Sequence, residues 1–206
     1  KLGLGITVPF GLTTKYNDNW VGRYHAVESD LQTININPSL AYRLNDSLSL
    51  GVGLNLMLAR ITFSNAIDFG AICYAALTPE ACNDEGNIPQ QSDGFADLTA
   101  DNFSDPGWGV NLGLLYELTD STRFGLAWRS QIDLHAQGEA KFIVPASAAF
   151  STSSGSFEDT GLAAGVTLPQ SLSLSSAHQM GDWTVLADIT WTGWSAFKEL
   201  RIRYDN

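Results

Sequence analysis

The sequence predicts an all-β fold: a transmembrane, antiparallel up-and-down β-barrel to which this chain contributes roughly seven strands. Three observations support this prediction. Apolar residues alternate with small or polar ones along many segments, the connections between these segments alternate between very short and very long, and aromatic residues recur beside the short connections. Together these features are typical of an outer-membrane barrel, which has tight periplasmic turns and long extracellular loops.

The clearest strand runs from Leu48 to Leu58. Every even-numbered position in it is Leu or Val, whereas the odd-numbered positions, apart from Met57, are small or polar. A two-residue period places the two sets on opposite faces of a sheet. We therefore expect the even-numbered residues to face lipid.

Six further segments show the same alternation and are predicted as strands: 1–10, 33–44, 108–117, 123–134, 171–175 and 183–191. Within 123–134 the pattern places Ile132 and Leu134 on the lipid face. A set of polar residues takes the other parity, and facing lipid would be costly for it, so we expect this set to face the lumen. The set comprises Asn35, Asn37, Asn55, Asn111, Arg129 and Asp133.

The connections are sorted by length. Tight turns are predicted near residues 45, 120 and 180, and long loops at about 11–30, 64–106 and 135–166. Tyr42, Tyr116 and Trp183 lie close to the tight turns, where an interfacial aromatic belt would lie. Soluble all-β domains rarely sort their loops in this way.

Composition narrows the class of protein. The chain has 206 residues, of which 44% are hydrophobic and 16% charged, and no apolar run reaches the roughly 18 residues of a membrane-spanning helix. The formal net charge of −11 argues against nucleic-acid binding, which needs the opposite sign. The acidic residues gather in the predicted loops. They either solvate that surface or bridge divalent cations to lipopolysaccharide, and the sequence leaves both interpretations open.

Enzymatic signatures are poor. The sequence contains no G-x-S-x-G elbow, P-loop or H-E-x-x-H segment, and it indicates no cofactor or metal site. A lipase-like arrangement of Ser and His stays a minor alternative because only geometry can reveal a triad. We therefore expect a protein that is not an enzyme.

The two cysteines, Cys73 and Cys82, lie in the longest predicted loop. An even pair nine positions apart in an oxidising compartment favours a local disulfide, and two free buried thiols are the alternative. Lys1 begins inside one strand pattern and Asn206 follows another. Residues 1–206 are thus expected to be a partial barrel domain, an internal piece of a longer chain.

Four segments resemble the long-chain fatty acid transport family of outer-membrane proteins, the FadL/TodX-like channels. The likeness runs through nearly the whole chain and is weakest in the two longest loops. The segments are 11–16 (GLTTKY), 35–45 (NINPSLAYRLN), 113–118 (GLLYEL) and 191–200 (WTGWSAFKEL).

This resemblance implies a bacterial outer-membrane, 14-stranded monomeric barrel plugged by an N-terminal hatch, so that the hatch and the last strands lie outside this piece. It also implies that ligand is captured between the loops 64–106 and 135–166. Their apolar residues would then bind it; alternatively, they pack the two loops against each other. These residues are Phe69, Ile72, Tyr74, Leu77, Phe142, Ile143, Val144 and Phe150.

The family also implies lateral exit through an opening beside a kinked strand. Pro9 cannot donate to a β ladder and Gly11 permits unusual backbone angles, so Pro9, Phe10 and Gly11 are the candidate kink. The alternative is that the strand simply ends at its loop.

The resemblance further implies basic residues that hold a ligand carboxylate. Arg60 and Arg129 are the candidates; Arg129 has the parity of the lumen, whereas Arg60 follows the lipid-facing leucines. The expected function is passive uptake of hydrophobic small molecules, most of all long-chain fatty acids, in contact with outer-membrane lipid and lipopolysaccharide. A channel for neutral aromatic hydrocarbons, an adhesin or phage receptor, and a lipid-modifying enzyme are the alternatives.

Overall fold

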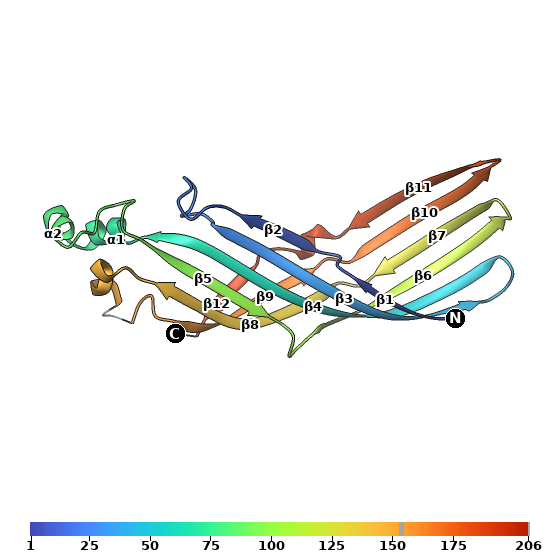
Figure 1. Ribbon diagram of the computed structural model, residues 1–206. Coiled ribbons are helices and arrows are strands. Elements are labelled where there is room, and N and C mark those ends of the chain that lie inside the picture. Colours follow the sequence, from blue (N-terminus) through green and yellow to red (C-terminus); the bar gives the residue numbers. More distant parts are fainter. Residues whose placement is uncertain (153–154, 206) are drawn as a thin grey trace.

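The computed structural model describes residues 1–152 and 155–205, and in them one antiparallel sheet of twelve strands (Figure 1). The strands are β1 (Leu2–Thr7), β2 (Gly11–Lys15), β3 (Glu28–Arg43), β4 (Leu48–Asp68), β5 (Asp93–Asp101), β6 (Gly107–Thr119), β7 (Thr122–Arg129), β8 (Ile132–Ile143), β9 (Thr160–Leu168), β10 (Ser171–Met180), β11 (Trp183–Thr192) and β12 (Arg201–Tyr204). Four short helices lie in the connections: α1 (Phe69–Ala76), α2 (Pro79–Asp84), and the 3-10 helices η1 (Ala146–Thr152) and η2 (Trp194–Ala196). None of the helices in the described residues is long and apolar enough to span a membrane.

The twelve strands form seven long ones. β1 and β2 both pair with β3, and β5 and β6 both pair with β4, so each of these couples is one interrupted strand. β7–β8, β9–β10 and β11–β12 are interrupted in the same way. With β3 and β4 this gives the seven strands that the sequence predicts. The three tight hairpins gather at one end of the sheet, and α1, α2 and η1 at the other (Figure 1).

The half of the sheet near the hairpins has the lipid face that the leucine pattern predicts. Leu40, Val52, Leu112, Trp128, Leu172 and Trp191 lie side by side in one register row across six strands. All but Trp128 are among the exposed residues of the chain. A continuous exposed apolar row is the surface that hydrocarbon requires of a barrel.

Beyond this half, the polarity of the two faces is reversed. The face that carries the leucines near the hairpins here carries polar residues. One register row across it consists of Gln32, Arg60, Asp101 and Gln137. β4 has 21 residues, whereas crossing the hydrocarbon takes about 9–11. We conclude that the half that carries α1 and α2 extends beyond the bilayer, where its outer face meets water.

The predicted long loops are therefore too long. The segments between strands are residues 16–27, 69–92 and 144–159, instead of 11–30, 64–106 and 135–166. All of β2 and β5, most of β8 and β9, and parts of β3 and β4 lie in what the sequence indicated as loop. Carboxylates such as Asp97, Asp101 and Glu139 suggested a loop because acidic residues are rare on the lipid-facing side of a strand.

Side chains replace backbone pairing at the interruptions. At 8–10, Thr33 Oγ1 donates to the Phe10 carbonyl (2.6 Å) and accepts from its N–H (3.1 Å). At 102–106, Asn102 Oδ1 accepts from Ala59 N–H (2.6 Å) and Asn102 Nδ2 donates to the Met57 carbonyl (3.1 Å). These contacts satisfy backbone groups of Phe10 and of β4 that would otherwise lose their partners.

The interruption at 130–131 changes the parity of the chain. The prediction that Ile132 and Leu134 face lipid is wrong, because both side chains are buried on the lumen side. A Cβ on Gly107 or Gly109 would meet them at 2.4 Å and 2.6 Å, so these glycines allow β8 to pass close over β6. Asp133 consequently faces outward, where it accepts from the Thr167 hydroxyl (2.6 Å), and not into the lumen as predicted.

Candidate functional site

The lumen side of the half of the sheet that carries α1 and α2 is an apolar wall. Its residues are small or branched and almost all come from the segments that the sequence indicated as loop or assigned to lipid. The wall consists of two buried clusters: Ala96, Leu98, Ala100, Ala136, Ala140, Leu162 and Ala164, and Met57, Ala59, Ile132, Leu134 and Leu168. Phe10 packs against the second cluster from the interruption between β1 and β2.

Below this wall, four asparagines form an amide cluster: Asn35, Asn37, Asn55 and Asn111. Asn37 Nδ2 donates to Asn111 Oδ1 (2.7 Å) and to Asn55 Oδ1 (3.2 Å), and Asn35 Nδ2 donates to Asn55 Oδ1 (3.0 Å). Asn55 Nδ2 donates to Asn111 Oδ1 (3.1 Å). The cluster lies over Gly53, where a Cβ would come within 2.7 Å of Asn111 Oδ1. The lumen-facing parity predicted for all four residues agrees with these contacts.

Of the two candidate arginines, the structure places only one beside this cluster. Arg129 lies directly opposite Asn111 in the ladder between β6 and β7, so both residues share the lumen face. Arg129 is half-buried as a residue, and its guanidinium has no hydrogen bond or ion pair with residues 1–152 or 155–205. Arg60 is exposed on the outer face, in register with Asp101. Of the two candidate arginines, Arg129 is thus the one that lies on the lumen face.

At the end of the sheet that carries α1 and α2, three phenylalanines meet. Phe69, fully buried at the start of α1, packs edge-on against Phe157 (centroids 5.0 Å apart), and Phe142 packs against the same ring (5.9 Å). Asn87 Nδ2 donates to the Ser147 carbonyl (2.7 Å) and so joins the two loops. The sequence analysis missed Phe157, which has a left-handed backbone (φ 58°), because it lies among serines and glycine.

The other apolar candidates are more scattered. Ile143 lies on the opposite face from Phe142 and is 57% exposed, so it does not join the cluster with which it was predicted. Tyr74 donates to Asn83 Oδ1 (2.6 Å) and ties α1 to α2, while Leu77 is exposed where α1 ends. Ile72, Val144 and Phe150 are partly buried. Among these candidates, Phe69 and Phe142 are brought together through Phe157.

A disulfide links Cys73 of α1 to Cys82 of α2, as the nine-residue spacing favours. Both cysteines are buried. The bridge ties together two helices that are too short to be stable alone. It therefore fixes the shape of the segment 69–92 that carries Phe69.

A polar latch fastens the segment 16–27 to the start of β5. Arg23 Nε donates to Asp93 Oδ2 (2.6 Å), and Arg23 Nη2 donates to the Tyr24 hydroxyl (2.7 Å). The Tyr24 hydroxyl in turn donates to Asp93 Oδ1 (2.6 Å). Burial and the bond to Asp93 raise the pKa of Tyr24 to about 12. The latch lies outside the membrane-spanning part of the sheet.

The raised pKa of Tyr24 predicts a latch that opens only at high pH. Because the folded pKa lies above the ordinary value of about 10, the stabilisation is complete below pH 10 and is lost as pH rises toward 12. A tyrosinate absorbance titration of the wild type minus that of Tyr24→Phe should give a midpoint near 12. A midpoint near 10 would show that the latch is absent in solution.

The interruption between β1 and β2 lies where the sequence places a kink. Residues 8–10 fall outside the ladder, whereas Gly11 already pairs with Gln32. The register between β1–β2 and β3 shifts by one residue there, from Thr7 opposite Asn35 to Gly11 opposite Gln32. The extra residue is a bulge in the strand, as expected where Pro9 provides no N–H.

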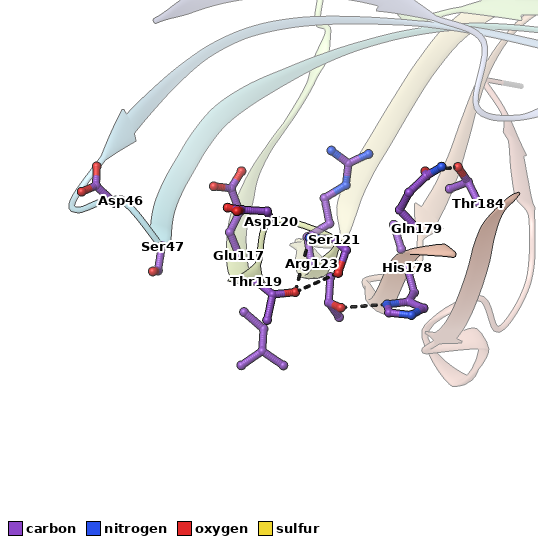
Figure 2. A pocket seen from close by; sticks show the side chains of 13 residues that line it. Asp46, Ser47, Glu117, Thr119, Asp120, Ser121, Arg123, His178, Gln179 and Thr184 are labelled. Carbon is purple, nitrogen blue, oxygen red and sulfur yellow. Dashed lines mark hydrogen bonds between the residues drawn. The ribbon is translucent and has the colours of Figure 1, made fainter. Parts of the chain in front are cut away.

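A separate recess of about 540 Å³ lies at the hairpin end of the sheet (Figure 2). Its lining is mostly polar: Thr122 Oγ1 bonds to His178 Nδ1 (2.8 Å), and Thr184 Oγ1 donates to Gln179 Oε1 (2.5 Å). Asp46 and Glu117 also line it. This recess does not suit a hydrophobic ligand, and it is far along the sheet from the phenylalanines at the other end.

The whole chain, residues 1–206, matches the family described as "Outer membrane protein transport protein (OMPP1/FadL/TodX)". It is 30% identical to a "Long-chain fatty acid transport protein" of Salmonella typhi and 27% identical to "Outer membrane protein P1" of Haemophilus influenzae. The two alignments cover 98% and 100% of this chain, respectively. These alignments cover 46% and 45% of the relatives, so the chain spans about half of their length.

Solved structures show the same fold. A FadL homologue of Pseudomonas aeruginosa superposes with a TM-score of 0.80 at 24% identity, over 99% of this chain and 48% of that one. The toluene transporter TbuX of Ralstonia pickettii gives 0.68 at 20% identity, over 98% and 54%. The sheet described above is therefore about half of a β-barrel.

Proposed function

Because the chain belongs to the OMPP1/FadL/TodX family of bacterial outer-membrane transport proteins, we propose that it forms about half of a channel that takes up hydrophobic molecules. One observation carries this proposal: the extracellular half of the sheet has its apolar residues on the lumen side and its charges outside. Such an arrangement offers a hydrophobic molecule a dry path out of the aqueous polysaccharide layer. The proposal assigns no chemical reaction to the chain.

We take long-chain fatty acids as the first candidate ligand, because the apolar wall leads to Arg129. The wall suits an acyl chain, and the guanidinium of this half-buried residue, without a partner in the described residues, suits a carboxylate. Neutral aromatic hydrocarbons are the second candidate, since the wall itself carries no charge; the relative TbuX is named a toluene transporter. A monomeric barrel with lipopolysaccharide around its polar outer face completes the proposal.

For release we propose lateral exit at the interruption between β1 and β2. Phe10 at this position packs against the apolar wall, and the link to β3 rests on the Thr33 hydroxyl in place of backbone pairing. A ligand moving along the wall would meet this weak point of the barrel before the hairpin end. In this proposal the interruption connects the lumen to lipid beside Phe10.

For capture we propose the phenylalanine cluster at the extracellular end. Phe142→Asn should lower uptake of labelled oleate at low concentration about tenfold in cells that lack their own transporter and carry the full-length protein. The reason is that apolar burial contributes about 25 cal/mol per Å², and Phe142 faces the lumen beside Phe157.

The adjacent residue provides a matched control. Ile143→Asn makes the same chemical change on the outer face, where the side chain is exposed, and should leave uptake unchanged. Equal uptake by both variants and the wild type would mean that the phenylalanines only hold the loops together. The adhesin or phage-receptor alternative would then gain support.

A further inference from the structure

The amide cluster has a direction. Asn55 Oδ1 accepts from both Asn35 and Asn37, and Asn111 Oδ1 accepts from both Asn37 and Asn55. Rotating the Asn35 amide would place its oxygen against the Asn55 oxygen, so the network fixes Asn35 with its nitrogen inward. One end of the cluster is therefore the Asn35 oxygen, an acceptor, and the other end lies at Asn111 beside Arg129.

The acceptor end is unsatisfied. Asn35 is only 1% exposed, and its Oδ1 has no hydrogen-bond partner among the described residues. The neighbouring Thr33 cannot supply one, because its single hydroxyl proton is donated to the Phe10 carbonyl. A buried amide oxygen without a donor is costly, so this position is suited to a molecule that brings one.

We propose that Asn35 Oδ1 accepts a hydrogen bond from the O–H of an uncharged headgroup, an alcohol or a protonated acid, on a hydrophobic molecule in the lumen. This inference rests on the proposed function and deepens it. An amide oxygen repels a carboxylate, which belongs at the Arg129 end of the cluster. Asn35 lies opposite Thr7, next to the interruption at residues 8–10, and only an uncharged headgroup could pass from there into lipid at low cost.

The test compares three 16-carbon ligands in transporter-deficient cells that carry the full-length protein: labelled 1-hexadecanol, palmitate and hexadecane. Asn35→Leu should lower uptake of hexadecanol below saturation about fivefold and leave hexadecane unchanged, since one hydrogen bond is lost. Arg129→Gln should lower palmitate uptake and spare hexadecanol. Ser39→Ala, on the same strand and face, is the matched control and should change nothing.

Each other outcome is decisive. Unchanged uptake of all three ligands by Asn35→Leu would show that water alone satisfies the oxygen, and an equal loss for all three would show a purely structural role; both overturn the inference. Failure of the wild type to take up any of the three would instead overturn the proposed function. If Asn35→Leu lowers the folded fraction, Asn35→Ala removes the same oxygen without an apolar branch beside Asn55 and is used in its place.

Discussion

Val52→Arg should lower the free energy of unfolding in lipid vesicles by about 2–4 kcal/mol, the cost of a cation at the midplane of a barrel's lipid face. Val52 stands in the exposed apolar row between Leu40 and Leu112. No carboxylate shares that row to compensate the charge. Denaturant titration of the full-length protein in vesicles measures the effect.

The control for this variant is Gly113, which lies on the neighbouring strand β6, next to the partner of Val52 in the ladder. Gly113 pairs with Gly51 on the lumen side, and a side chain added there meets nothing within 4 Å. Gly113→Arg should therefore fold with nearly the stability of the wild type. Equal loss of stability in both variants would mean that the leucine face does not meet lipid.

The sequence was informative wherever one face of a strand meets hydrocarbon. The leucine period between Leu48 and Leu58, the three tight turns and the number of long strands, seven, were predicted correctly. In that half of the sheet a charge on the wrong face is expensive, so the alternation is strict. Local pattern and three-dimensional position then agree.

The half of the sheet that carries α1 and α2 gave no such signal. There both faces of β5 and β8 tolerate small residues, and the carboxylates of Asp97 and Glu139 lie on the face that meets water. The sequence therefore predicts loops in place of these strands. The parity change at 130–131 depends on how Ser130 meets β6: its hydroxyl accepts from the Val110 N–H (2.9 Å). Such a contact between strands cannot be found from spacing alone.

Part of the candidate site could be predicted from the sequence. The asparagines and Arg129 were recognisable because polar residues interrupt an otherwise strict apolar pattern, and their lumen parity was predicted correctly. The apolar wall was missed, since its alanines carry little pattern of their own. Phe157 was missed because a single aromatic in a Ser/Gly-rich segment has no period to place it.

The close passage of β8 over β6 gives the second large effect. The double variant Gly107→Val, Gly109→Val should destabilise the barrel by about 1–3 kcal/mol per site, because each new Cβ would meet Ile132 or Leu134 at less than 3 Å. Strand propensity predicts the opposite sign, since Val favours strands over Gly by up to about 1 kcal/mol. Denaturant titration of the full-length protein in vesicles therefore decides between packing and propensity.

Gly113→Val separates the effect of packing from that of strand propensity, because Gly113 lies on the same strand and the same face as Gly107 and Gly109. Open space surrounds that position, so propensity acts there alone and the variant should be neutral or slightly more stable. If the double variant behaved like Gly113→Val, Ile132 and Leu134 would not lie over β6. The conclusion that the apolar wall faces the lumen would then be wrong, because it depends on the side chains of Ile132 and Leu134 turning inward at the interruption before β8.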